Sequence, residues 1–235
     1  MTPAENVDGP TGRRVTEDVL EVATAHGPAR VRRRRPDDPR GLVILTHGAN
    51  GAIGTKDLLA LATALPEHGW SVALVEQAFV VAGRRTPPRA PAQDEAYLPV
   101  VAALVADVAN AAGGARVGPV VLGGRSNGAR VACRTAVASG GDGVLCLAFP
   151  LHPPGAPDRS RADELARPYA ADLPVLVVQG RTDAFGTPAE VFAAAPAGAE
   201  IVEVPGGHGF TANPVAVVEA VLAWLGREWP PPSSR

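Results

Sequence analysis

Short, continuously apolar segments that alternate with amphipathic segments restrict the fold of this chain more than any other feature. Apolar runs of this kind are typical of strands buried on both faces of a parallel sheet, because helices cover both sides. After Gly41 they occupy residues 42–45, 72–75, 117–122, 144–149, 175–178 and 201–204. Apolar residues at three- and four-residue spacing predict helices at 56–67, 94–111, 127–138, 187–194 and 214–224. This alternation predicts an α/β fold with a doubly wound, mostly parallel sheet.

Two further segments add antiparallel strands before this pattern begins. Residues 19–25 and 29–33 alternate apolar and polar side chains on either side of His26-Gly27-Pro28, which is typical of an antiparallel hairpin. The complete sheet then has about eight strands, with helices on both faces. We expect this α/β domain to span residues 17–229, with a disordered tail at 1–16 and a second tail at 230–235.

Composition limits the classes of protein to which the chain can belong. Its 235 residues suit one domain, and 46% hydrophobic residues with 20% charged residues indicate a globular chain. The net charge of −2 does not favour nucleic acid as a partner. The N-terminus lacks the apolar core of a signal peptide, and no apolar run reaches the roughly 18 residues of a membrane helix. We therefore expect a cytoplasmic protein that binds neither nucleic acid nor membranes.

Residues 124–128, Gly-Arg-Ser-Asn-Gly, give the strongest indication of chemistry. They follow the expected strand 117–122 and lead directly into an expected helix. On such a tight turn a serine presents its hydroxyl above the sheet, and glycines two residues away on each side avoid a collision. The alternative is a glycine-rich turn with an incidental serine. The position between strand and helix favours Ser126 as a nucleophile.

A serine nucleophile needs an adjacent base, and in this arrangement the acid and then the histidine follow it along the chain. His208 lies in Gly-Gly-His-Gly-Phe, between the last expected strand and the last helix. Asp183 follows the expected strand 175–178, whereas Asp172 precedes it and Glu203 lies inside another strand. The sequence therefore predicts a catalytic triad of Ser126, Asp183 and His208, in which the aspartate fixes the imidazole tautomer.

Backbone amides are expected to form an oxyanion hole. One amide is that of Asn127, directly after the nucleophile, and the other comes from the loop after the third expected strand. In that loop Ala49 is the first choice and Asn50 the second, while His47 is expected to hold the loop by a hydrogen bond.

Two segments, 80–93 and 151–167, follow strands and are expected over the carboxyl edge of the sheet, where ligands bind in open α/β sheets. Side chains in these segments or beside the nucleophile are candidate substrate contacts: Arg84, Arg85, Arg89, Arg125 and His152. The arginines would attract a carboxylate or phosphate. In the alternative, Arg125 pairs with a nearby acid, the other arginines are solvated, and His152 packs in its turn. The sequence leaves open whether 80–93 covers the site.

The two cysteines lack the spacing of a zinc ribbon or a thioredoxin-type site. Cys133 and Cys146 lie in apolar stretches without a CxxC motif and are expected to be buried thiols. We expect no metal and no cofactor.

Several motifs together resemble the dienelactone-hydrolase-like group of α/β-hydrolases. These are HGAN after the third expected strand, GRSNG at the turn, QGRTDAFG around the acid and GGHGF around the base. The segment FPLHPPG at 149–155 is similar to the branch that contains testis-expressed protein thirty and the third subunit of the nonspecific-lethal acetyltransferase complex. The resemblance extends from about Gly41 to Trp224 and implies the α/β-hydrolase fold and the serine triad.

The sequence departs from this group in one respect that affects the substrate. Dienelactone hydrolases use a cysteine nucleophile, whereas this chain has Ser126 at that position, so their substrate does not carry over. The eukaryotic relatives are chiefly complex subunits, so the branch implies no particular reaction.

The predicted function is a serine hydrolase that cleaves a small-molecule carboxylic ester or thioester through an acyl-enzyme. Short connections predict no large lid before the acid, which disfavours interfacial lipase behaviour. One alternative is a non-catalytic interaction module on a hydrolase scaffold, and another is an acyltransferase or cyclase that uses the same triad. The natural substrate and the oligomeric state are not determined by the sequence.

Overall fold

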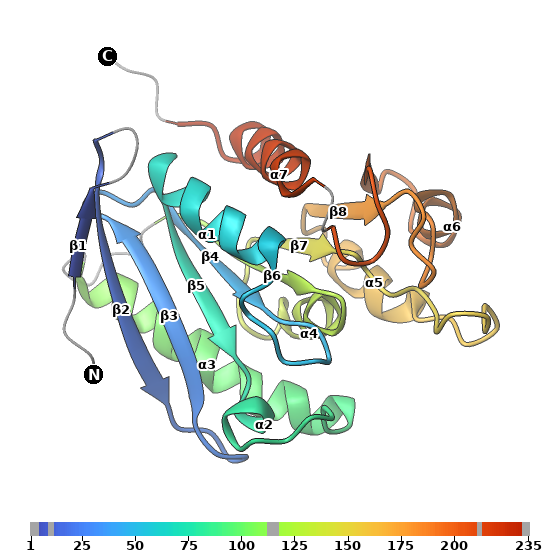
Figure 1. Ribbon diagram of the computed structural model, residues 1–235, viewed down its shortest axis with the longest axis horizontal. Coiled ribbons are helices and arrows are strands. Elements are labelled where there is room, and N and C mark those ends of the chain that lie inside the picture. Colours follow the sequence, from blue (N-terminus) through green and yellow to red (C-terminus); the bar gives the residue numbers. More distant parts are fainter. Residues whose placement is uncertain (1–4, 9–11, 112–117, 211–212, 232–235) are drawn as a thin grey trace.

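A single mixed sheet forms the centre of the computed structural model, which describes residues 5–8, 12–111, 118–210 and 213–231. Its nine strands are arranged in the order β1-β2-β3-β5-β4-β6-β7-β8-β9. Figure 1 shows the sheet with its helices. The strands are β1 (Glu5–Asp8), β2 (Arg14–Val22), β3 (Ala29–Pro36), β4 (Gly41–Thr46), β5 (Trp70–Glu76), β6 (Val120–Arg125), β7 (Gly143–Leu147), β8 (Val175–Gly180) and β9 (Glu200–Val204).

The strands from β4 to β9 run parallel to one another, and β1, β2 and β3 pair in antiparallel fashion at one end of the sheet. All residues of β4, β6, β7 and β8 are buried, as the continuous apolar runs predict. The carboxyl ends of the parallel strands meet at one edge, and the loops that leave this edge are therefore neighbours in space.

Helices cover both faces of the sheet. They are α1 (Lys56–Glu67), α2 (Ala78–Val81), α3 (Ala90–Ala111), α4 (Asn127–Thr135), α5 (Ala162–Tyr169), α6 (Pro188–Ala194) and α7 (Pro214–Glu228). Residues of α3 and α4 belong to one core cluster, and residues of α1 and α7 to the other. Figure 1 shows α1 and α7 together on one side of the sheet. The predicted doubly wound α/β architecture is confirmed, with nine described strands where about eight were expected.

The N-terminal segment differs from the prediction. We expected a tail at 1–16, whereas β1 pairs with β2, and β2 already begins at Arg14. Val15 is buried in the sheet opposite Pro36, so burial of this side chain favours a strand over a free tail. Of the second expected tail, 230–235, residues 232–235 lie outside the described residues.

The two segments that lay outside the expected strands and helices contain helices. The segment 80–93 includes the end of α2 and the first residues of α3, and 151–167 includes most of α5. In α5 the side chains of Leu165 and Glu164 are buried against neighbouring elements, so tertiary contacts support a short helix that the sequence pattern did not reveal. The strand expected at 117–122 begins at Val120 and extends to Arg125, and Val117 lies outside the described residues.

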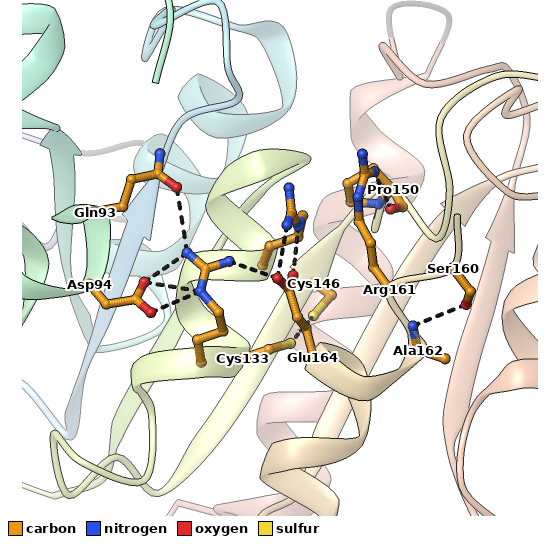
Figure 2. A network of polar contacts seen from close by, with 11 residues as sticks. Gln93, Asp94, Cys133, Cys146, Pro150, Ser160, Arg161, Ala162 and Glu164 are labelled. Carbon is orange, nitrogen blue, oxygen red and sulfur yellow. Dashed lines mark hydrogen bonds and ion pairs between the residues drawn. The ribbon is translucent and has the colours of Figure 1, made fainter. Parts of the chain in front are cut away.

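Cys133 and Cys146 are buried free thiols, as expected. Their sulfur atoms lie 3.4 Å apart where α4 packs on β7 (Figure 2). Among the described residues, no helix is both long and apolar enough to cross a membrane.

Candidate active site

Ser126 occupies a sharp turn between β6 and α4. Its φ of 53° and ψ of −114° are unusual for a residue with a side chain, and such a conformation costs about 1–3 kcal/mol. Its amide donates a hydrogen bond to the carbonyl of Leu147, 2.8 Å away in the adjacent strand. The surrounding structure thus holds the serine in a strained conformation above the edge of the sheet.

Glycines on both sides of Ser126 allow this turn to pack tightly. A Cβ atom on Gly124 would lie 2.6 Å from the carbonyl carbon of Gly128. A Cβ atom on Gly128 would lie 2.5 Å from the carbonyl oxygen of Thr46 and 2.8 Å from that of His47. Gly128 is therefore needed for two reasons. It allows the tight turn itself, and it allows this turn to pack against the end of β4 and the loop that follows.

His208 joins Ser126 to Asp183, and all three follow strands at the carboxyl edge. The Nε2 atom of His208 lies 2.8 Å from Oγ of Ser126, and its Nδ1 atom lies 2.8 Å from Oδ2 of Asp183. A carboxylate accepts only, so Nδ1 carries the proton and Nε2 is free to accept the serine hydrogen. The structure therefore brings the three predicted residues together in a continuous hydrogen-bonded chain.

Two residues that the sequence analysis did not identify support this chain. The side-chain amide of Gln179 donates to Oδ2 of Asp183 at 3.0 Å and to the carbonyl of Gly186 at 2.7 Å. The amide of Phe185 donates to Oδ1 of Asp183 at 2.8 Å, and its ring lies 4.3 Å from the imidazole of His208, centroid to centroid. The position of Gln179 near the end of an otherwise apolar strand could have indicated a polar role at the carboxyl edge. Nothing in the sequence indicated that the ring of Phe185 stacks on His208.

The loop after β4 presents backbone amides beside the serine. The amide of Gly51 donates to the carbonyl of Gly48 at 3.0 Å, which places Ala49 and Asn50 at the exposed tip of a turn. A Cβ atom on Gly48 would lie 3.4 Å from Cβ of Ser126. Within the described part of the chain, the amides of Ala49 and Asn127 have no hydrogen-bond partner. Neither predicted donor is therefore occupied by another described group.

His47 holds this loop from inside the protein, in agreement with the structural role expected for it. Its Nδ1 atom donates to the carbonyl of Gly48 at 2.7 Å, and its Nε2 atom accepts a hydrogen bond from the amide of Gln77 at 3.0 Å. Burial lowers the pKa of His47, and this effect outweighs the opposing influence of the Gly48 carbonyl and of Glu76. Because Nε2 accepts a hydrogen bond while Nδ1 donates one, the ring is neutral and both of its nitrogen atoms have a partner.

Arg125 is not arranged as a free cation for a substrate. The residue is 8% exposed, its Nε atom lies 3.3 Å from Oδ2 of Asp57, and Nη2 donates to the carbonyl of His208 at 2.6 Å. This geometry favours the alternative stated above, in which Arg125 pairs with a nearby acid.

The other candidate substrate contacts form no hydrogen bond with Ser126, Asp183 or His208 among the described residues. Arg84, Arg85 and Arg89 are exposed between α2 and α3, and their side chains form no hydrogen bond or ion pair with any described residue. The amide of His152 donates to the carbonyl of Phe185 at 3.1 Å, and its Nδ1 atom donates to the carbonyl of Pro153 at 3.0 Å. His152 therefore packs in its own turn beside the acid loop, which is the alternative given for it.

Ion pairs attach α4, which begins directly after the nucleophile, to its neighbours. Figure 2 shows Gln93, Asp94 and Glu164 around one guanidinium group, that of Arg134. Glu164 also receives two hydrogen bonds from Arg130, at 2.6 and 2.8 Å. These contacts link α4 to α3 and α5. No group of three or more His, Cys, Asp or Glu residues suited to a metal ion occurs in the described ranges.

Comparisons with known proteins agree with the fold that carries this site. A family model described as an alpha/beta hydrolase domain matches residues 39–213. The structure is similar to that of a serine hydrolase without a lid from Xanthomonas campestris, with a TM-score of 0.72, 20% identity and coverage of 93% of this chain and 97% of that chain.

Two other solved structures are similar. One is an alpha-beta serine hydrolase homologue from Coxiella burnetii, with a TM-score of 0.69, 20% identity and coverage of 88% of this chain and 96% of that chain. The other is a cold-adapted esterase from an Arctic intertidal metagenomic library, with a TM-score of 0.68, 15% identity and coverage of 95% and 97%. At these identities the similarity establishes the shared fold.

Proposed function

Because the chain belongs to the alpha/beta hydrolase family, we propose that it is a serine hydrolase that cleaves carboxylic esters or thioesters through an acyl-enzyme on Ser126. The observation that carries the proposal is the hydrogen-bonded chain from Ser126 through His208 to Asp183, with both bonds 2.8 Å long. The substrate class is a small molecule, in line with the serine hydrolases and esterases among the similar structures.

In the acylation step, Oγ of Ser126 attacks the carbonyl carbon while Nε2 of His208 accepts its proton. Asp183 stabilises the imidazolium that forms and keeps its ring in the required orientation. The amides of Ala49 and Asn127, with Asn50 as the alternative donor in the loop, stabilise the tetrahedral oxyanion. One such donor contributes about 2.7–4 kcal/mol of transition-state stabilisation in enzymes of this mechanism. The imidazolium then protonates the leaving alcohol or thiol.

In the deacylation step, His208 removes a proton from water as the water oxygen attacks the acyl carbon, and the imidazolium then returns this proton to Oγ of Ser126 as the acid is released. The exposed tip of the loop at Ala49 and Asn50 and the 22% exposure of the His208 side chain are compatible with entry of water. An acyltransferase or cyclase would use an alcohol or amine in place of this water, so the product distinguishes these activities.

The strained serine favours catalysis over a purely structural use of the scaffold. A non-glycine residue at φ 53° lowers stability and persists only where the surroundings impose it. An interaction module without activity has no need of that conformation, nor of two amides left without partners beside it.

Labelling with a fluorophosphonate probe tests the proposal directly. We expect one adduct on Ser126, located by intact mass and peptide mapping, and no adduct on Ser126→Ala. A panel of ester and thioester substrates then defines the acyl and leaving groups. A folded wild-type protein that does not react would contradict the proposed activity and favour the interaction module.

Asp183→Asn tests the role of the acid, with Asp172→Asn as a matched control. Asparagine at position 183 favours the wrong imidazole tautomer, and we expect kcat to fall roughly 10³- to 10⁴-fold. Asp172 precedes β8 and has a φ of 54°, a conformation that asparagine tolerates well. The control is expected to keep wild-type kcat, and equal losses in both variants would contradict the assignment of Asp183.

The finer placement of the chain in the dienelactone-hydrolase-like group, and in the branch with the HPPG segment, is also part of this proposal. So is the cytoplasmic location expected from the sequence.

A further inference from the structure

We propose that Arg125 is a positioning residue that fixes the base His208 relative to the nucleophile Ser126. This inference rests on the proposed function and adds a residue to it. Among the described residues, the Arg125 side chain forms no hydrogen bond with Oγ of Ser126 or with the imidazole ring of His208. Instead it acts on the backbone that carries the imidazole.

One guanidinium group contacts three separate segments of the site. Its Nη2 atom donates to the main-chain carbonyl of His208 at 2.6 Å. Its Nε atom lies 3.3 Å from Oδ2 of Asp57, in the first turn of α1. Its Nη1 atom lies 3.4 Å from the position that a Cβ atom on Gly48 would occupy, so it packs against the loop of the proposed oxyanion hole. Arg125 immediately precedes Ser126. Its contacts therefore connect the turn that carries the nucleophile to the histidine loop, to α1 and to the loop after β4.

Asp57 holds the guanidinium from the inner side. Its side chain is 0% exposed, and neither carboxylate oxygen forms a hydrogen bond with any of the described residues. A buried carboxylate without a cation is unfavourable, so the ion pair keeps Arg125 oriented toward the interior. A solvated arginine would lose this orientation and could not act as a fixed donor.

The histidine loop needs such an anchor. His208 lies between β9 and α7 in a segment without helix or strand, and it is flanked by Gly206, Gly207 and Gly209. Glycines confer conformational freedom on the backbone, whereas the base must remain within hydrogen-bond distance of Oγ. A charge-assisted hydrogen bond to the carbonyl of His208 itself restrains the residue that carries the base.

The principal test is Arg125→Lys, assayed on an ester that the wild type hydrolyses. Lysine keeps the charge but has a single ammonium group, which cannot reproduce the planar fork that spans Asp57 and His208. A displacement of about 1 Å in a catalytic group lowers the rate up to roughly 100-fold, so we expect kcat to fall about 10- to 100-fold with KM changed less than about threefold. The proton between His208 and Asp183 should give a low-field NMR signal in the wild type that shifts or broadens in the variant.

Arg33→Lys is the matched control. Arg33 is 5% exposed and pairs with the buried Asp18 through two hydrogen bonds, but it lies on β3, far from the triad in the sheet order. This variant keeps the charge but loses a comparable buried guanidinium–carboxylate geometry, and we expect lower thermal stability with unchanged kcat. A loss of kcat in both variants would show that destabilisation alone explains the effect and would overturn the inference.

A charge-balanced double variant, Arg125→Met with Asp57→Asn, covers the case in which Arg125→Lys does not fold. It leaves no unpaired buried charge while removing the donor to His208, and the same selective fall in kcat is expected. Wild-type kcat in either folded variant would overturn the positioning role while the proposed hydrolase activity stands. If the wild type fails to react with the fluorophosphonate, the proposed function is contradicted, and this inference fails with it.

Discussion

Ser126, Gly124 and Gly128 show how single residues determine the geometry of the site. The serine adopts a positive φ, and the glycines permit contacts that any side chain would block. The GxSxG pattern predicts the sharp turn at the serine. The contact between Gly128 and the carbonyl of Thr46 depends on the neighbouring strand β4, which is distant in the sequence.

Gly128→Ala is expected to destabilise the protein and impair its reaction with the fluorophosphonate. Its Cβ atom would lie 2.5 Å from a backbone oxygen, so the elbow or the loop after β4 must shift, at a cost of about 1–3 kcal/mol. The free energy of unfolding and the labelling rate measure the two effects.

Gly226→Ala provides the control for this substitution. Gly226 lies in the exposed part of α7, with no atom within 4 Å of an added Cβ, and alanine there should stabilise the helix by about 0.5–1 kcal/mol. A Gly128→Ala variant as stable and reactive as the wild type would show that the close approach at the elbow is not required.

At the level of elements, α4 is held on both sides by partly buried ion pairs. Arg134 pairs with Asp94 of α3, and Arg130 and Arg134 both pair with Glu164 of α5. Because Ser126 immediately precedes α4, these contacts help to hold the helix beneath the nucleophile. Although α5 was not predicted from periodicity, it supplies the carboxylate that completes this arrangement.

Glu164→Gln should reveal the contribution of this carboxylate through its pH dependence. Burial disfavours the charged form of Glu164, but hydrogen bonds from Arg130 and the charges of Arg130, Arg134 and Arg161 outweigh burial and lower its pKa. Its stabilising effect is therefore present above the unfolded-state pKa of about 4.3 and is lost as the pH falls through the lower folded-state pKa.

We expect Glu164→Gln to lower the free energy of unfolding at pH 7 by about 1–3 kcal/mol, because hydrogen bonds to a charged group are lost. The difference from the wild type should shrink as the pH is lowered from about 5 to 3. Denaturant unfolding at several pH values measures it, with Glu219→Gln on the exposed face of α7 as control. A difference that does not vary with pH would rule out the ionised carboxylate as its source.

For the molecule as a whole, the connection between β7 and β8 is the place where a large lid before the acid would be inserted. It comprises residues 148–174 and contains one helix, α5, which packs against α4. In Figure 1 this helix lies beside the sheet as part of the helical layer. The expectation of no large lid thus agrees with the architecture.

We therefore expect hydrolysis of a short-chain triglyceride to follow simple saturation kinetics through its solubility limit. A lipase with a mobile lid gains activity at an interface because the lid opens there, and this chain has no comparable segment between β7 and β8. Rates measured in solution and in emulsion, with a lid-bearing lipase as comparator, test this. An abrupt rise in rate at the solubility limit would contradict an uncovered site.

The sequence by itself determined the α/β architecture and the three residues of the hydrogen-bonded chain. Buried parallel strands leave apolar runs, and Ser126, Asp183 and His208 each follow such a run in the order that the mechanism requires. These signals are local, because periodicity and turn chemistry depend on a few consecutive residues. The expected catalytic roles of these residues stay predictions until the labelling experiment is done.

The tertiary structure alone decided which partners the buried polar side chains have. Arg125 had two interpretations in the sequence, and only the meeting of α1 and the histidine loop at one edge of the sheet pairs it with Asp57 and His208. Phe185 and α5 likewise acquire their places through contacts with distant segments, and the side-chain amide of Gln179 donates to the carbonyl of Phe149 in the preceding strand connection. The physical reason is that a buried charge or amide is stabilised by whichever group the fold brings near it, and spacing along the chain does not encode that neighbour.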